Sequence, residues 1–156
     1  MRVYLASDHA GFELKAFLLR RLAERGFETV DVGAHHYDAG DDYPAFCIEA
    51  GRRVVADPGS LGVVIGGSGN GEQIAANKVR GVRAALAWNP DTARLAREHN
   101  DANVVAVGAR MHDEETAATL VELFLATPFS GESRHARRIA QLADYEADPV
   151  APVVPS

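Results

Sequence analysis

The chain has 156 residues, 47% of them hydrophobic, and its 16 basic and 22 acidic residues leave a net charge of −6. This length and apolar content suit one globular domain with a sizeable core, and the negative charge argues against a nucleic-acid-binding protein. The single cysteine, Cys47, excludes a disulfide framework and a cysteine-rich metal site and indicates a reducing compartment.

Short β-rich runs alternate with helical patterns along the chain. This alternation predicts right-handed crossovers on a parallel sheet, which is an α/β fold. Turn and capping signals agree, since residues 89–91 place a helix cap, a proline and an acidic residue in order. The expected strands are Val3–Ala6, Thr29–Val32, Leu61–Ile65, Val82–Ala87 and Val104–Val107. The expected helices are Gly11–Arg25, Pro44–Ala56, Gly71–Val79, Pro90–Glu98, Glu114–Ala126 and Glu132–Glu146.

The chain shows no internal repeat and no linker between domains. We expect one domain over residues 1–148 and a disordered tail over residues 149–156, which holds three prolines. The apolar run at residues 1–7 is too short for a signal peptide, and no run approaches the length of a membrane span. We therefore expect a cytoplasmic protein without membrane contact.

The most informative stretch is residues 61–77, where an apolar run ends in four glycines interleaved with Ser68, Asn70 and Glu72. Glycines allow the backbone to approach a ligand closely, and the first amides of the following helix favour an anion. Glu72 would repel a phosphate, so it indicates proton chemistry. A carboxylate beside an amide array and the Ser68 hydroxyl suits abstraction of a proton from carbon. The alternative is a favourable charge at a helix start.

Polar side chains follow several of the expected strands. Ligands of an open parallel sheet collect at the carboxyl ends of its strands, so these residues are expected to converge. Taken singly, Asp8 is as consistent with a helix cap as with a site residue, and His9 is as consistent with a solvated loop residue as with a site residue. A histidine at a helix end is either a favourable charge or a general acid and base. The residues in question are Asp8 and His9, the turn from Gly66 to Glu72, the helix end at His99 and Asn100, and Arg110.

Three further features are weaker evidence for a binding site. Arg134 and Arg138 lie four residues apart on one helix face and suit a phosphate, although exposed arginines are common. The histidines and aspartates of residues 35–42 lack a metal-ligand spacing, which favours a polar loop over a metal site. The alternating glycines at 67, 69 and 71 do not match the dinucleotide fingerprint.

Three motifs together resemble the type B ribose-5-phosphate isomerase family, and the resemblance runs from the first residue to about Tyr145. The motifs are Ser7–Lys15, Gly66–Lys78 and Arg97–Asn100. The resemblance implies a Rossmann-like three-layer α/β/α fold and a homodimer with sites at the subunit interface. It also implies interconversion of ribose 5-phosphate and ribulose 5-phosphate through an enediolate, in the pentose phosphate pathway, with no metal and no cofactor.

The resemblance also implies roles for individual residues. Asp8 and His9 would contact the sugar phosphate, and His99 with Asp8 would open the furanose ring. The turn with Ser68 would hold the oxyanion. The turn residues are Gly67, Ser68, Gly69, Asn70 and Gly71, and the remaining substrate and phosphate positions are Asn100, Arg110, Arg134 and Arg138.

The chain departs from many members of this family at two positions. They place a cysteine base where this chain has Gly66 and an apolar residue where it has Glu72. A second branch, which includes actinobacterial enzymes, uses the glutamate, so we expect Glu72 to be the base. Cys47 lies in a different element, where we expect it to pack as a small apolar residue.

Two alternative functions stay open. Related proteins isomerise six-carbon sugar phosphates such as allose or galactose 6-phosphate, and the depth of the pocket decides between the substrates. A sugar-phosphate-sensing module without catalysis would keep the arginines and glycines but would have no use for Glu72 and His99 together. The sequence also leaves open which subunit supplies each arginine and whether dimers pair into tetramers.

Overall fold

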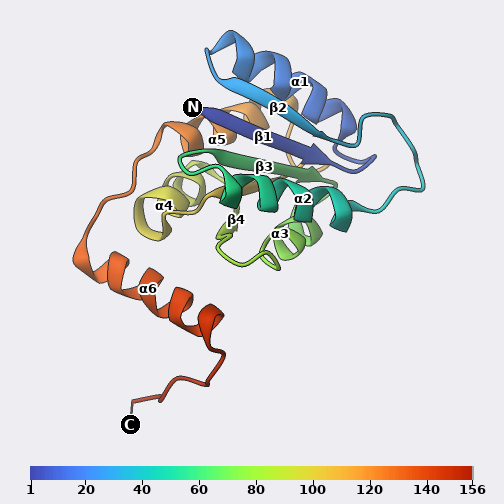
Figure 1. Ribbon diagram of the computed structural model, residues 1–156. Coiled ribbons are helices and arrows are strands. Elements are labelled where there is room, and N and C mark those ends of the chain that lie inside the picture. Colours follow the sequence, from blue (N-terminus) through green and yellow to red (C-terminus); the bar gives the residue numbers. More distant parts are fainter. Residues whose placement is uncertain (156) are drawn as a thin grey trace.

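A computed structural model describes residues 1–155. Its centre is a five-stranded parallel sheet with the strand order β2-β1-β3-β5-β4 (Figure 1). The strands are β1 Arg2–Ser7, β2 Glu28–Gly33, β3 Leu61–Gly66, β4 Ala84–Leu86 and β5 Val104–Gly108. The helices are α1 Phe12–Glu24, α2 Tyr43–Ala56, α3 Asn70–Ala76, α4 Pro90–Asn100, α5 Glu114–Ala126 and α6 Ser133–Ala147.

Helices cover both faces of the sheet, and each face has its own apolar core. Successive strand residues point to opposite faces, so Leu5 and Ile65 pack on one side and Ala6 and Val64 on the other. Helices α1, α4 and α5 cover the first side, and α2 and α3 cover the second. The predicted α/β sandwich is therefore confirmed, because both faces of a parallel sheet are buried.

The expected helices and strands are all present, and the largest differences lie around β4. Helix α3 ends at Ala76 rather than Val79, because the next amides bond three residues back, from Lys78 to Ala75 and from Val79 to Ala76. The Asn77 side chain then bonds to both the N–H and the carbonyl of Ala84, at 2.8 and 3.0 Å. The side chain thereby supplies hydrogen-bond partners to the backbone N–H and carbonyl of Ala84 on the outer edge of the short strand β4.

Helix α6 extends away from the sheet and packs mainly against α4 (Figure 1). Only His135 of this helix is buried. Residues 149–155 follow it without helix or strand, and the disorder expected there stays a prediction. Within residues 1–155, none of the helices combines the length and apolar character that a membrane span requires.

Candidate active site

The loops after β1, β3 and β5 meet at the carboxyl edge of the sheet. Pairing places Ser7 beside Ile65 and Gly66 beside Gly108, so the loops that follow start side by side. The Arg110 N–H donates to the carbonyl of Gly67 at 3.0 Å. This edge therefore brings together the residues predicted from the first, third and fifth strands, which we call the carboxyl-edge group: Asp8, His9, Ser68, Glu72 and Arg110.

Asp8 shapes the turn between β1 and α1. Its side chain is buried, and Oδ1 accepts hydrogen bonds from the N–H groups of Ala10 and Gly11 at 3.0 and 3.2 Å. The helix cap itself is Gly11, so Asp8 supports the turn without being the cap residue. This contact holds the carboxylate in one orientation at the edge of the sheet.

Glu72 lies in the first turn of α3 and is only 4% exposed. Its carboxylate fills the space beside the Gly66 backbone, since a Cβ atom on Gly66 would lie 1.8 Å from Oε1 and 2.5 Å from Oε2. Burial raises the pKa of Glu72, and the charge of Asp8 adds to the rise, whereas the backbone N–H groups of Glu72 and Gly69 oppose it. A carboxylate with a raised pKa suits a general base near neutral pH.

The turn before α3 is built around Gly69, whose φ of +86° lies in the left-handed region. The Asn70 N–H donates to Oγ of Ser68 at 3.2 Å, which fixes the serine side chain within the turn. The Tyr43 ring, at the start of α2, lies against Gly71, where a Cβ atom would come within 2.5 Å of Cζ. Tyr43 therefore lies against the glycine that directly precedes Glu72, a contact that sequence reasoning missed.

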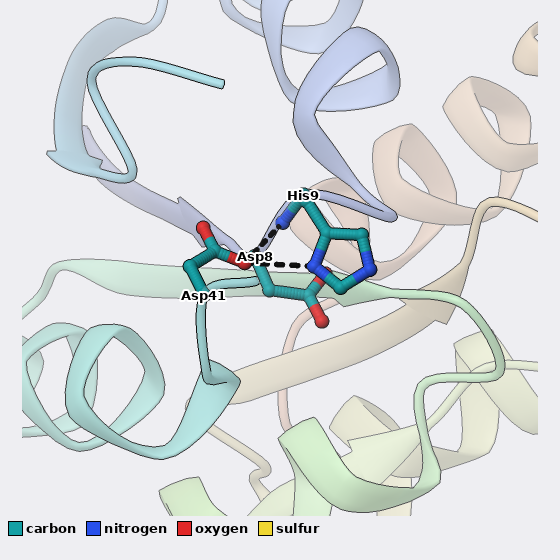
Figure 2. Close-up of side chains that lie close together, drawn as sticks. All are labelled: Asp8, His9 and Asp41. Atoms are coloured by element: carbon teal, nitrogen blue, oxygen red, sulfur yellow. Dashed lines mark hydrogen bonds and ion pairs between the residues drawn. The ribbon is translucent and has the colours of Figure 1, made fainter. Parts of the chain in front are cut away.

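His9 and Asp41 form a close pair at the same edge. Asp41 Oδ1 accepts from the His9 backbone N–H at 2.8 Å and lies 2.8 Å from Nδ1 of the ring (Figure 2). With Asp8 they form the one group in residues 1–155 whose donor atoms lie close enough for a metal, within 4.8 Å. Because Nδ1 is already engaged with the carboxylate, we interpret the group as a carboxylate–histidine pair, and a site without metal stays our prediction.

Cys47 lies on α2 and is fully buried. Burial raises the pKa of its thiol, and the charges of Glu72 and Asp8 raise it further. The thiol is therefore protonated at neutral pH and unsuited to be a base. The prediction that Cys47 packs as a small apolar residue of a helix is confirmed.

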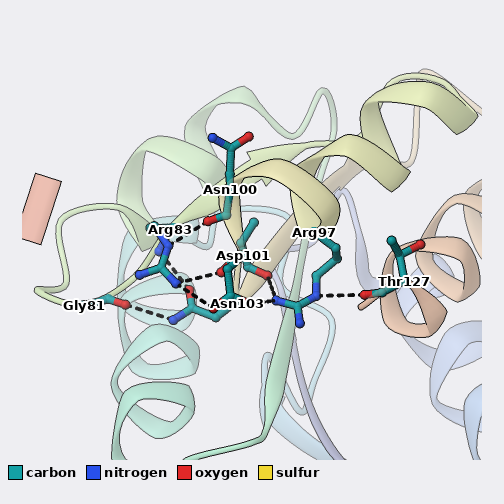
Figure 3. A network of polar contacts seen from close by, with 8 residues as sticks. Gly81, Arg83, Arg97, Asn100, Asp101, Asn103 and Thr127 are labelled. Atoms are coloured by element: carbon teal, nitrogen blue, oxygen red, sulfur yellow. Dashed lines mark hydrogen bonds and ion pairs between the residues drawn. The ribbon is translucent and has the colours of Figure 1, made fainter. Parts of the chain in front are cut away.

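His99 and Asn100 lie at the opposite, amino edge of the sheet, so the expectation that they converge with Asp8 within one chain is wrong. Helix α4 follows β4 and leads back to the start of β5, so its last residues return to the amino ends of the strands. Arg83, directly before β4, donates from Nε to the carbonyl of Asn100 at 2.9 Å. Figure 3 shows this contact, with the side-chain amide of Asn100 pointing away from the arginine.

The end of α4 is held by two arginines (Figure 3). Asp101 follows the helix with a left-handed φ of 43°. Arg97 Nη1 donates to Oδ1 of Asp101 at 2.7 Å, and Arg83 Nη2 donates to its carbonyl at 2.8 Å. These contacts fix the backbone that presents His99 and Asn100.

The start of α6 joins His99 at this amino edge. The His135 ring is buried and stacks on the His99 ring, with centroids 4.2 Å apart and planes 16° from parallel. Burial lowers the pKa of His135, and the neighbouring charges of His99 and Arg134 lower it further. Arg134 and Arg138 lie on the same helix and not with Glu72. We call these residues the amino-edge group: His99, Asn100, Arg134, His135 and Arg138.

His135 and Asp41 were not among the predicted site residues. A signal for His135 was its place between Arg134 and Arg138 on an amphipathic helix. Asp41 carried no such signal, because its contact with His9 depends on the path of the loop between β2 and α2. The residues predicted to form the site thus fall into two groups at opposite edges of one chain.

Comparison with known proteins identifies the family. A model of the ribose/galactose isomerase family matches residues 3–142. The chain belongs to the ribose/galactose isomerase family. One family member, ribose-5-phosphate isomerase B of Mycobacterium tuberculosis, is 59% identical over 155 residues, which cover 99% of this chain and 96% of that protein. Another, the probable ribose-5-phosphate isomerase B of Mycoplasma pneumoniae, is 38% identical over 146 residues, which cover 94% and 95%.

Solved structures of family members share the fold. Ribose-5-phosphate isomerase B of Clostridium thermocellum has a TM-score of 0.91 and 39% identity, with 96% of this chain and 100% of that chain covered. The enzyme of Mycoplasma genitalium, solved with bound ribulose-5-phosphate, has a TM-score of 0.90 and 38% identity, with 94% and 97% covered. The family and the fold predicted from the motifs are therefore confirmed.

Proposed function

We propose that this protein interconverts ribose 5-phosphate and ribulose 5-phosphate by proton transfer, in the pentose phosphate pathway of the cytoplasm. The observation that carries the proposal is the buried Glu72 carboxylate beside the glycine-rich turn. The relatives named ribose-5-phosphate isomerase B and the ribulose-5-phosphate complex of the Mycoplasma genitalium enzyme support the substrate class.

The chemistry requires a base, an acid and a set of donors for the developing oxyanion. In the proposed mechanism His99 and Asp8 open the furanose ring. Glu72 then takes the C2 proton of the aldehyde, the proton of the C2 hydroxyl passes to O1, and Glu72 returns its proton to C1, which leaves the ketone at C2. Ser68 and the amides of residues 67–71 stabilise the oxyanion of the enediolate. Proton transfer between neighbouring carbons involves no net redox change, so the mechanism includes no cofactor.

Phosphate binding would orient the reacting carbons. Arg110, Arg134 and Arg138, with His9 and Asn100, are proposed to hold the phosphate and the sugar hydroxyls. Binding energy from a group that does not react is then used to place C1 and C2 against the base.

We also propose that the site is completed between two copies of the chain. Within one chain, the carboxyl-edge group and the amino-edge group lie at opposite edges of the sheet. Helix α6 extends from the sheet and exposes nearly all of its residues, which is costly for an amphipathic helix without a partner. In a two-fold symmetric dimer, the amino-edge group of each subunit would face the carboxyl-edge group of the other.

The function is tested by assaying the pure protein with ribose 5-phosphate, and in parallel with allose 6-phosphate, each with and without a chelator. We expect isomerisation of the pentose phosphate at an unchanged rate after exhaustive chelation, because side chains and backbone amides supply the chemistry. Turnover that stops in chelator and returns with a divalent ion would contradict the metal-free mechanism. A preference for the six-carbon substrate would favour the alternative isomerase, and binding without turnover would favour a sensing module.

Mixing two inactive variants should restore activity if the site combines two subunits. Glu72→Gln damages the carboxyl-edge group and His99→Gln damages the amino-edge group. In a heterodimer both defects fall in one site and the other site is intact, so random exchange should recover about one quarter of the parental activity. The measurement is turnover after the mixed variants are unfolded and refolded together. Recovery no greater than the sum of the separate variants would show that one chain supplies both groups.

Arg138→Ala should raise the Michaelis constant for ribose 5-phosphate about ten- to a hundredfold, since a charge-assisted contact to phosphate contributes roughly 1.5–3 kcal/mol. Competition by a phosphate-free sugar should hardly change. Arg137→Ala, from the same helix but outside the predicted set, serves as the matched control. If inorganic phosphate binds the Arg138 variant as well as the parent, α6 does not hold the phosphate.

A further inference from the structure

The Asp41 carboxylate contacts both the backbone and the ring of His9. A single oxygen, Oδ1, accepts from the His9 backbone N–H at 2.8 Å and pairs with Nδ1 at 2.8 Å. The other oxygen, Oδ2, is buried and accepts no hydrogen bond from the described residues. The Asp41 side chain is 10% exposed, so this is a largely buried carboxylate whose one close partner is His9.

We propose that Asp41 is a positioning residue of the isomerase. It holds the His9 ring as an imidazolium whose Nδ1–H donates to the Asp41 carboxylate and whose Nε2–H donates to the sugar phosphate. The inference rests on the proposed function of the site. Figure 2 shows the second ring nitrogen of His9 pointing away from Asp41. With Nδ1 committed as a donor, Nε2 is the ring nitrogen left for a ligand.

The charges around His9 agree with this role. The hydrogen bond to Asp41 raises the pKa of His9, and the charge of Asp8 on its own loop raises it further, whereas burial and Arg110 from the loop after β5 lower it. A buried carboxylate with one unbonded oxygen is costly unless a cation lies beside it. A cationic imidazole offers that charge and donates from both nitrogens, which suits a phosphate or hydroxyl oxygen.

The loop that carries Asp41 is fixed to the sheet where it leaves β2. Lys15, 2% exposed, donates from Nζ to the carbonyl of Ala34 and to Oδ1 of Asp31, both at 2.6 Å. The Ala34 N–H donates to the carbonyl of Ser7 at 2.8 Å, so the loop starts beside the end of β1. These contacts fix the start of the loop, and after the exposed residues 35–40 the chain returns to the site, where Asp41 is held by its two contacts with His9.

The test uses Asp41→Asn, which keeps an acceptor for the His9 N–H but removes the charge. NMR titration of the His9 ring should show a lower pKa than in the parent. The Michaelis constant for ribose 5-phosphate should rise on the order of tenfold at a pH above this lowered pKa and recover at lower pH, with a smaller change in kcat. Asp38→Asn, an exposed aspartate of the same loop whose bond to the Gly40 N–H the amide can keep, should change neither quantity.

Repeating the Asp41→Asn substitution in a His9→Gln variant separates positioning of His9 from a general structural effect of the Asp41 substitution. If Asp41 acts through His9, adding Asp41→Asn to His9→Gln should leave the Michaelis constant of the single His9 variant unchanged. Independent, multiplying effects of the two changes would overturn the proposal, as would an unchanged His9 titration in a folded Asp41→Asn protein. The titration needs no turnover, so a parent that does not isomerise ribose 5-phosphate would refute the proposed function while the His9 pKa still decides the role of Asp41.

Discussion

Glu72→Gln should bind ribose 5-phosphate with little loss of affinity but turn it over ~10²–10⁴ times more slowly, the usual span for a lost general base. The substitution keeps the shape of the side chain and removes the carboxylate that accepts the C2 proton. Steady-state kinetics and substrate binding measure the two effects separately. In deuterated water the parent should also incorporate deuterium at carbon during isomerisation, because a base exchanges the proton with solvent and a hydride shift does not.

The pH dependence should identify the same group. Glu72 must be ionised to act as a base, and burial raises its pKa above the ordinary glutamate value of about 4.3. Parental kcat should therefore fall as the pH drops through this raised pKa, and the Gln variant should lack that acid limb. A carboxyl group whose pKa is raised on folding contributes stability below its unfolded pKa that is lost as the pH rises through the folded pKa. The Gln variant should thus unfold at an equal or higher temperature at neutral pH, so its slow turnover cannot come from unfolding.

Cys47→Ser is the control for the one thiol of the chain, because the family resemblance offers a cysteine as well as a glutamate as the base. The thiol is buried in α2 with a raised pKa, so its replacement should leave turnover within a few-fold of the parent. Parental activity in the Glu72→Gln variant would contradict the assignment of Glu72 as the base. Loss of turnover in a folded Cys47→Ser protein, with Glu72→Gln active, would transfer the role to the cysteine.

Most of the fold could be predicted because local signals and periodicity agree along the chain. The apolar run Leu61–Gly66 is buried on both faces, as a central parallel strand requires, and the cap at Asn89 starts α4 where expected. Helix α3 is the exception. Its last predicted turn gives way to tighter bonds after Ala76, and Asn77 leaves the helix to bond to Ala84. Such a side-chain contact across the fold is not encoded in a helical pattern.

The candidate site could be predicted only in part, because the order of residues along the chain does not show at which end of the parallel strands each polar residue lies. Residues after strands converge at one edge, and Asp8, Ser68 and Glu72 do so. His99 ends a helix, and a helix between parallel strands runs back to the amino ends of the strands. A polar residue at the end of such a helix therefore lies opposite to the polar residues that follow the strands. The contact between His9 and Asp41 spans 32 positions and depends on a loop path that no local pattern specifies.

The position of Glu72 depends on the absence of a side chain at Gly66. A Cβ atom there would lie 1.8 Å from Oε1 and 2.0 Å from Cδ of Glu72, so the carboxylate and any side chain on residue 66 exclude each other. The φ of Gly66 lies outside the left-handed region, and the conflict is with the end of a side chain that can rotate, so the Ala variant should fold. The geometry therefore makes a side chain at position 66 and the observed position of the Glu72 carboxylate mutually exclusive in this chain.

Gly66→Ala should therefore lower turnover about a hundredfold by moving the carboxylate, since a displacement of about 1 Å in a reacting group has an effect of this order. The matched control is the same change in a Glu72→Ala background, where no carboxylate is left to displace and turnover should not fall further. Conversely, Gly66→Cys combined with Glu72→Ala should place a thiol in the space that the carboxylate vacates. We expect this double variant to exceed Glu72→Ala in turnover, with a pH profile that rises toward the ordinary thiol pKa of about 8.5. Full activity in Gly66→Ala, or an equal loss from this substitution with and without Glu72, would show that the glycine does not set the position of the base.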